Sequence, residues 1–240
     1  PVTGHSGAGV GTAAPERSHA CAVSAVSRHQ GGSSPRDIWE PRVERACQNQ
    51  RMDLVPSSSL KIELTWHTDL TPGQLDDLNR LFAAEYREDC GEWDPDQPYG
   101  YAPHDMHVIA TLDAQTVGHI GWARRSIAVG AHPVTIAGVG GVLVAPSGRG
   151  HHVGQRLMRS AVDSMRVHSD AEFGYLGCDE SVVPFYVSCG WQRIVAAERS
   201  IGRGGQPTQS TQGEPLLVMP LRGTEQLWPA GEIDLRGRPW

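Results

Sequence analysis

The sequence predicts an α/β (α+β) fold, a single domain with a central mixed sheet and helices on both of its faces. Three observations predict it: segments with strand-like alternation, two amphipathic helical segments, and an apolar strand that leads directly into a glycine-rich turn and a helix. The domain is expected to span residues 60–240. Residues 1–59 are rich in Gly, Ser, Ala, Pro and Arg without sustained periodicity, so we expect a disordered or non-native N-terminal extension there.

The first elements follow from local patterns. KIELTW, from Leu60 onward, alternates apolar and polar residues as a half-buried strand does. Thr71 and Pro72 begin an amphipathic helix, because threonine caps a helix well and proline is accepted in its first turn. This helix is expected to end near Cys90. MHVIATLD and QTVGHIGWARRSIAVG then form a hairpin, joined by a short Asp-Ala turn.

The second half of the domain contains the central strand. VTIAGVGGVLVAP is apolar on both faces, which indicates a buried position in the sheet. It leads into the helical segment RGHHVGQRLMRSAVDSMRVH. Three further strands are predicted at FGYLGC, WQRIVA and PLLVMPL, with a helical stretch around VVPFYVSCGW.

Composition excludes several classes of protein. A formal net charge of −6 argues against nucleic acid as a partner, because nucleic-acid binding depends on basic surfaces. The chain contains no apolar run of the roughly 18 residues that a membrane span needs, nor a start typical of a secretory signal, so we expect a cytoplasmic protein without a membrane partner. Five cysteines without a CxxC pair predict reduced thiols, and the 11 histidines show no metal-ligand spacing, so no metal is expected.

The turn after the central strand is the strongest candidate binding site. A strand that turns into a helix directs successive backbone N–H groups and the positive helix end at one point, which suits a pyrophosphate. We expect cofactor contacts from the strand end and the turn, although an ordinary loop into a helix remains an alternative for this fragment alone. The residues are Val142, Leu143, Val144, Arg149, Gly150, His151, His152, Val153 and Gly154.

The run V-x-V-x-P-x-x-R-G-x-x-V-G-x-x-L resembles the acetyl-coenzyme A signature of GCN5-related N-acetyltransferases (GNAT), with His152 where the middle glycine usually lies. The later run FYVSCGW is similar to the family's Tyr-x-x-x-Gly-aromatic motif. The resemblance implies acetyl-CoA as cosubstrate, backbone N–H groups around Leu143 and Val144 on the thioester oxygen, and Tyr186 as the general acid that protonates the departing thiolate. A core aromatic at position 186 is the alternative.

Residues 60–240 resemble two groups of enzymes that modify amino sugars. IGWARRSIAVG, FYVSCGW and the closing DLRGRPW look similar to aminoglycoside 2′-N-acetyltransferases. LWPAGEIDLRG and GHIGWARRSIAVG look similar to nodulation-type N-acyltransferases, which acylate a chito-oligosaccharide amine. The aminoglycoside match ranks first. A glutamate that helps deprotonate the amine in those enzymes corresponds to Gly140, and an acidic residue near their end corresponds to Arg238.

Other groups therefore have to accept the amine proton. We expect the carboxylate of Trp240 to fold into the site, with Asp179 and Glu180 as further candidates, because an amine must be neutral before it attacks.

Seven carboxylates between Glu85 and Asp105, among them Asp94 and Asp96, form an acidic loop that would attract a cationic substrate. A solvated loop without function is the alternative. Trp93, Tyr99 and Tyr101 of this loop are candidates for stacking on sugar rings.

The sequence thus predicts transfer of an acetyl group from acetyl-CoA to an aminoglycoside or related aminosugar amine, favouring the 2′ position and giving antibiotic resistance. One alternative is an N-acyltransferase that uses a longer acyl thioester on an amino-oligosaccharide. Another is a protein that binds an aminoglycoside or coenzyme A without turnover. The sequence is compatible with a homodimer.

Overall fold

The structure is a computed structural model that describes residues 59–210, 215–223 and 227–240. The extension expected at residues 1–59 therefore lies outside the described residues, apart from Ser59. The strands are β1 (Leu60–Trp66), β2 (Met106–Leu112), β3 (Gln115–Val129), β4 (His132–Val144), β5 (Phe173–Gly177), β6 (Gln192–Ile194), β7 (Glu198–Ile201), β8 (Pro207–Ser210), β9 (Leu216–Pro220) and β10 (Ile233–Asp234). The helices are α1 (Pro72–Cys90), α2 (Val153–His168) and α3 (Val183–Ser188), with short 3-10 turns at His67–Asp69, Pro98–Gly100, Pro146–Gly148 and Glu180–Val182.

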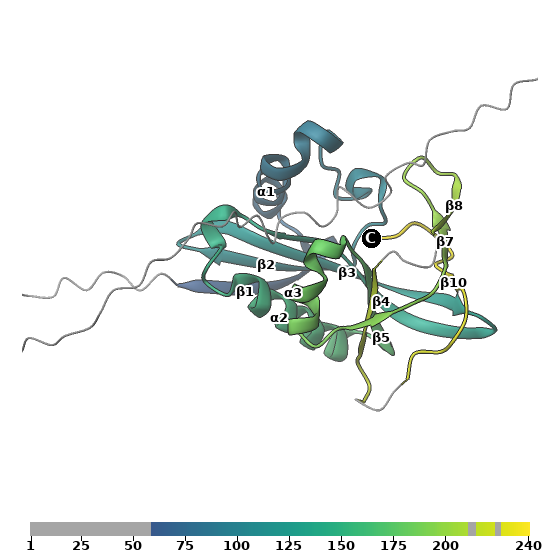
Figure 1. Cartoon of the computed structure of the whole chain (residues 1–240). Helices are drawn as coiled ribbons and strands as arrows, with labels where there is room; N and C mark the ends of the chain where they lie inside the picture. Colours follow the sequence, from purple (N-terminus) through teal and green to yellow (C-terminus); the bar gives the residue numbers. More distant parts are fainter. Residues whose placement is uncertain (1–58, 211–214, 224–226) are drawn as a thin grey trace, which may run out of the picture.

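These strands form one mixed sheet. Its order is β6-β9-β5-β4-β3-β10-β7-β8, with β2 and then β1 added beside β3. The predicted hairpin of β2 and β3 is confirmed, and Asp113 and Ala114 make its turn with φ values of 49° and 65°. The predicted strand β4 is central, between β3 and β5 (Figure 1).

Helices cover both faces of the sheet, as predicted. Figure 1 shows α1 on one side, and α2 and α3 on the other. Successive side chains of β2 point into two hydrophobic cores on opposite faces of the sheet. Val108 and Ala110 pack in the core that contains Leu157 of α2, whereas Ile109 packs in the core that contains Leu78 of α1. This period of two is what a sheet buried on both faces requires.

The predicted start of α1 is confirmed in detail. The hydroxyl of Thr71 accepts from the Gln74 N–H, and the Gln74 amide oxygen accepts from the Thr71 N–H at 3.0 Å. This capping box satisfies two N–H groups that would otherwise have no partner. The helix ends at Gly91, which has a φ of 82°.

Two expectations need correction or extension. The β7–β8 hairpin and the two-residue strand β10 were not predicted, because their sequences are short and largely polar. Cys178 and Cys189 are free thiols, as expected, but Cys90 is disulfide-bonded. None of the described helices is long and apolar enough to cross a membrane.

Candidate active site

The site begins where β4 and β5 separate. The two strands pair in parallel over only three residue pairs, from Ile136 opposite Phe173 to Gly138 opposite Tyr175. Beyond Gly138, within the described residues, no strand pairs with this edge of β4. A small pocket lies at the separation and is lined by Val139, Tyr175, Leu176, Gly177, Glu198, Leu235, Pro239 and Trp240.

A β-bulge lies in β4 just past the separation. The pairing of β3 with β4 shifts register between His119 and Gly121, and Gly141 adopts a φ of 57°. Such a bulge bends the strand and interrupts its ladder of hydrogen bonds. Leu143 and Val144, whose main chain is expected to hold the thioester oxygen, follow the bulge together with Val142, and the side chains of all three are buried.

The predicted cofactor turn connects β4 to α2. Arg149, His151 and His152 are exposed, and Gly150 and His152 both have positive φ values, 82° and 55°. Val153 is buried and begins α2. A side chain added at Gly150 would meet no atom within 4 Å, which leaves its main chain open to a ligand, whereas one at Gly154 would approach Phe185 of α3 at 3.3 Å. Close packing against α3 therefore also favours a glycine at position 154.

Tyr186 lies on α3, on the same side of the sheet as α2. Its side chain is almost fully buried and packs edge-on against Phe185 and Trp191. Burial, together with the neighbouring Cys178, Tyr86 and Cys189, raises the pKa of Tyr186 well above its usual range. The phenol therefore keeps its proton at neutral pH, as a general acid must.

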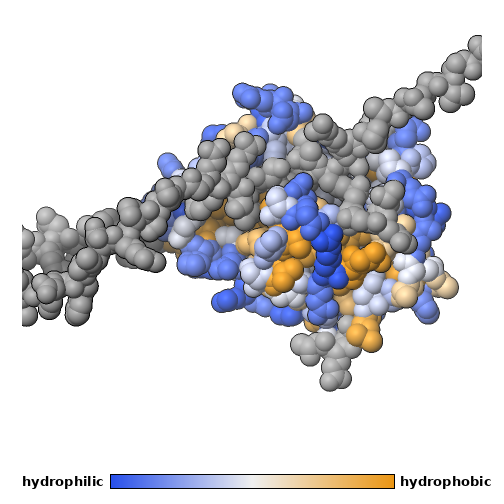
Figure 2. Space-filling model, viewed as in Figure 1, coloured by the Kyte–Doolittle hydropathy of each residue, from blue (hydrophilic) through white to orange (hydrophobic). Residues whose placement is uncertain are grey.

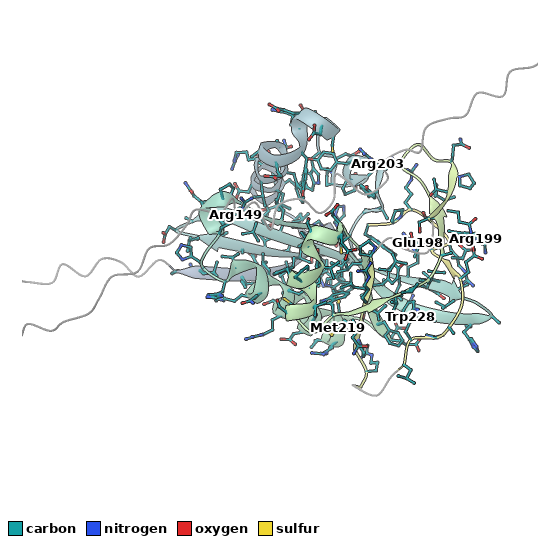
Figure 3. The ribbon with its side chains drawn as sticks, viewed as in Figure 1. Arg149, Glu198, Arg199, Arg203, Met219 and Trp228 are labelled. Carbon is teal, nitrogen blue, oxygen red and sulfur yellow. The ribbon has the colours of Figure 1, made fainter. Side chains whose placement is uncertain are left out.

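A groove runs beside α2 and α3. Apolar side chains of Met158, Val162 and Met219 line it together with the basic Arg159 and Arg166. Figure 2 shows hydrophobic and hydrophilic residues side by side on this face of the molecule. In Figure 3, Arg149 and Glu198 lie on either side of α3.

The C-terminal segment lies on β4. A side chain at Gly138 would meet the indole of Trp240 at 2.1 Å, and one at Gly140 would meet the main-chain carboxyl carbon of Trp240 at 2.4 Å. The carboxyl group of Trp240 thus occupies the space of a side chain at position 140, where the resembling aminoglycoside enzymes have their glutamate. The guanidinium of Arg125 lies 3.8 Å from the Trp240 ring centroid.

Main-chain hydrogen bonds fix this segment in place. The Ala102 N–H donates to the Pro239 carbonyl at 2.8 Å, and Arg125 donates to the Arg238 carbonyl at 2.6 Å. Arg238, at the position expected to be acidic, donates to the carbonyls of Gly100, Gly202 and Arg203. Its role in this chain is therefore to anchor the tail.

The predicted substrate residues are spread over two regions. Asp94 accepts from the Asp96 N–H, and Asp96 pairs with His67 at 3.1 Å. Asp179 caps a short turn by accepting from the Ser181 N–H, and hydrogen bonds from the side chain and the main chain of Ser181 lower the pKa of Asp179. Glu180 makes two hydrogen bonds to Arg193 at 2.6 and 2.9 Å. All four carboxylates are exposed.

The aromatic residues of the acidic loop are not placed for sugar stacking. Trp93 is buried and stacks on Phe82 with ring centroids 5.1 Å apart, and Tyr101 is buried too. Tyr99 packs edge-on against Phe82 and Tyr86. The stacking expectation is wrong for Trp93 and Tyr101, because the loop uses these rings to pack on α1 and the protein interior.

The structure adds two groups that sequence reasoning missed. Glu198 is a buried carboxylate that accepts a hydrogen bond from the Tyr175 hydroxyl beside the pocket at the strand separation. Three buried histidines, His104, His107 and His119, converge beneath the bulge of β4. Glu198 and Tyr175 come from separate strands, and although His104 and His107 are three residues apart, only the fold brings His119 of β3 to them.

A mixed sheet whose central strands separate next to a helix N-terminus is the arrangement of the GNAT acyltransferase fold. The GNAT family N-acetyltransferase YhbS from Escherichia coli, solved in complex with CoA, matches with a TM-score of 0.50 and 15% identity over 75% of this chain and 91% of that chain. Escherichia coli ElaA gives 0.49 and 19% identity, covering 67% and 99% of the two chains. A GNAT acetyltransferase from Brucella melitensis in complex with acetyl-CoA gives 0.46 and 15%, covering 72% and 94%.

At these identities the YhbS likeness establishes the fold alone. The family model of nodulation protein A (NodA) matches residues 57–239, which is most of the chain. The protein therefore belongs to the NodA family. No curated protein sequence matches it.

The packing of the tail on β4 gives a first prediction. Gly140→Ala places a methyl group 2.4 Å from the Trp240 carboxyl carbon, so the tail has to move. We expect the free energy of unfolding in guanidinium chloride to fall by about 1–3 kcal/mol. Carboxypeptidase should also remove Trp240 faster than in the unmodified protein, as followed by mass spectrometry.

Gly73→Ala is the matched control, because a side chain there meets no atom within 4 Å. In a helix this change should raise the free energy of unfolding by about 0.5–1 kcal/mol. If Gly140→Ala left both stability and tail cleavage unchanged, the placement of Trp240 on β4 would be wrong.

Proposed function

We propose that this protein is an N-acyltransferase that transfers an acyl group from a thioester donor to the amine of an amino sugar. The observation that carries the proposal is the separation of β4 from β5 beside the α2 N-terminus, with the protonated phenol of Tyr186 on the neighbouring helix α3. The donor's pantetheine arm would lie in this separation. Its pyrophosphate would contact the N–H groups of the turn from Arg149 to Gly154.

The reaction is a direct transfer. The neutral amine attacks the thioester carbon, and the new C–N bond forms as negative charge develops on the carbonyl oxygen. Of the N–H groups expected around Leu143 and Val144, that of Val144 would stabilise this oxyanion, because strand N–H groups alternate between edges and that of Ala145 donates to Val117 of β3. When the C–S bond breaks, Tyr186 donates its proton to the thiolate.

The family match changes which of the two candidate acceptor substrates ranks first. Membership of the NodA family favours the nodulation-type alternative, a longer acyl thioester and an amino-oligosaccharide, over the aminoglycoside. The groove beside α2 and α3 also suits this donor, because Met158, Val162 and Met219 offer an apolar surface and Arg159 and Arg166 can pair with phosphates. An aminoglycoside 2′-amine with acetyl-CoA stays the second candidate, favoured by the tail that ends on Trp240.

The amine proton needs an acceptor near Gly140. We assign this role to the carboxylate that Trp240 carries in this chain, because its carboxyl carbon occupies the space of the glutamate in the resembling enzymes. Glu198 is a second carboxylate at the same pocket. Asp94, Asp96, Asp179 and Glu180 remain predicted contacts for a cationic substrate, with Glu180 available only if its pair with Arg193 opens.

Product mass after incubation with paired donors and acceptors tests the function. The donors are acetyl-CoA, a long-chain acyl-CoA and the same acyl chain on a carrier protein. The acceptors are a chito-oligosaccharide with one free amine, its fully N-acetylated form, and aminoglycosides with and without a 2′-amine. We expect a long acyl chain on the free-amine oligosaccharide and none on the N-acetylated form. Acetylation of 2′-amines alone would favour the second candidate, and binding without product would contradict an enzyme.

Tyr186→Phe isolates the proposed acid. The ring that packs against Phe185 and Trp191 is retained, and only the proton donor is lost. We expect kcat at pH 7 to fall by about 10²–10⁴-fold, with little change in KM. Tyr99→Phe removes another buried phenol hydroxyl and should leave kcat unchanged. Equal rates for both variants would exclude Tyr186 as the acid.

Appending one glycine after Trp240 isolates the proposed base. The indole keeps its contact with Gly138, while the free carboxylate moves one residue away. We expect kcat to fall by about 10²-fold or more, because general-base catalysis contributes that much. Deleting Pro239 and Trp240 should remove activity as well. Unchanged turnover in the extended protein would assign the base to another group, with Glu198 examined next by Glu198→Gln.

A further inference from the structure

Three buried histidines converge on one space beneath the β4 bulge. His104 comes from the loop before β2, His107 from β2 and His119 from β3, and one ring nitrogen of each lies within 4.8 Å of the others. Their ring centroids are separated by 5.2, 5.7 and 5.8 Å. The three rings therefore surround a common point from three directions.

Hydrogen bonds behind the rings determine which nitrogens carry protons. The Gly141 carbonyl can only accept, so His119 must donate to it from Nδ1, at 2.7 Å, and its Nε2 is bare in the neutral ring. The Asp96 carboxylate likewise accepts from Nε2 of His67, at 3.1 Å, which leaves Nδ1 of a neutral His67 bare. This Nδ1 accepts from Nε2 of His107 at 3.1 Å. The Nδ1 of His107 is then bare as well.

When Nδ1 of His67 is bare, two lone pairs face each other, because Nδ1 of His107 and Nε2 of His119 lie 2.9 Å apart, and a cation between or near them satisfies both. When Nδ1 of His67 carries a proton, it donates to His107, and Nδ1 of His107 can donate to His119 instead. A shared proton would also satisfy this pair, so the position of His104 has to distinguish the two occupants.

His104 discriminates further between a proton and a metal ion. Both of its ring nitrogens are buried and, among the described residues, have no hydrogen-bond partner. A proton shared by His107 and His119 would leave His104 unsatisfied. A metal ion bound by all three rings gives one nitrogen of each ring a partner, including His104, with the Gly141 carbonyl and His67 orienting two of the ligands from behind, as outer partners do in metal sites.

We propose that His104, His107 and His119 form a binding site for a divalent first-row transition-metal ion, with Zn²⁺ the best fit. Three neutral imidazoles and an open fourth position are typical of zinc sites, and bonds of about 2.0–2.1 Å are expected. Small side-chain rotations must widen the His107–His119 pair and bring His104 closer. Because His119 holds Gly141 and His104 lies against Gly140, the ion would stabilise the bulge from which the main chain faces the thioester.

The sequence analysis missed this site: His104 and His107 are three residues apart in the chain, but the third ligand, His119, comes from the next strand and only the fold brings it to them. The inference also does not depend on acyl transfer, because metal binding is measured without any substrate. A protein that binds Zn²⁺ and does not transfer acyl groups would support the site and contradict only the proposed function.

Metal content of the full, untagged chain tests the proposal. The protein is stripped with a chelator, dialysed and titrated with Zn²⁺, and the bound metal is measured by mass spectrometry. Titration with Co²⁺ adds an absorption spectrum that reports tetrahedral coordination. We expect a single ion per chain in the unmodified protein and in His132→Gln, a control that changes an exposed histidine at the start of β4.

Two variants make the assignment specific. His67→Gln removes an outer partner and should weaken Zn²⁺ affinity about 10–100-fold. His104→Gln removes a ligand and should weaken it further, with circular dichroism confirming that the variant is folded. Metal uptake is also measured by comparing the metal-free and metal-loaded forms of the unmodified chain. The test for a metal site therefore does not depend on any variant.

The proposal is overturned if the unmodified protein takes up neither Zn²⁺ nor Co²⁺, or if His104→Gln binds as well as the control. In the first case, ¹⁵N chemical shifts of the histidine side chains should show a proton on Nδ1 of His107, which identifies a shared proton in place of a metal ion.

Discussion

The separation of β4 from β5 is the constraint on which the rest of the site depends. If β4 and β5 stayed paired along their whole length, hydrogen bonds would occupy both of the facing strand edges. No opening for a donor would then remain between the two strands. Here the pairing stops at Gly138, while β4 continues to Val144 beside β3. The free edge, the bulge at Gly141 and the helix N-terminus at Val153 follow one another within a short length of chain, so the main-chain groups that we propose for thioester and pyrophosphate are positioned together.

Two glycines make this arrangement compatible with the tail. Gly138 and Gly140 project from the same face of β4, and their missing side chains leave the space that Trp240 fills. The contact explains why this chain lacks a glutamate at position 140: a longer side chain and the tail cannot both be there. The Arg125 guanidinium above the indole and the hydrogen bond from Ala102 to Pro239 keep the tail in that space.

Periodicity allowed most of the fold to be predicted from the sequence. β1, β2, β3, β4 and both long helices have clear apolar alternation or capping residues, and each lies where it was expected. β7, β8 and β10 lack such a pattern, since they are short, polar and stabilised by pairing with distant segments such as the end of β3. The turn at Arg149 and the phenol of Tyr186 could be predicted because each belongs to a local motif. Glu198 and the three histidines could not, because only the register of the sheet and one loop bring them together.

The C-terminal segment also affects how specificity for the proposed acceptor can change in evolution. Its anchors are largely main-chain carbonyls, of Pro239 and Arg238, together with one arginine side chain that holds three other carbonyls. Such anchors tolerate changes in the side chains around them. Because Gly138 and Gly140 lie beneath the tail, substitutions in a few of its residues can change the wall of the proposed acceptor pocket, while the folding core and the proposed donor site stay unaltered.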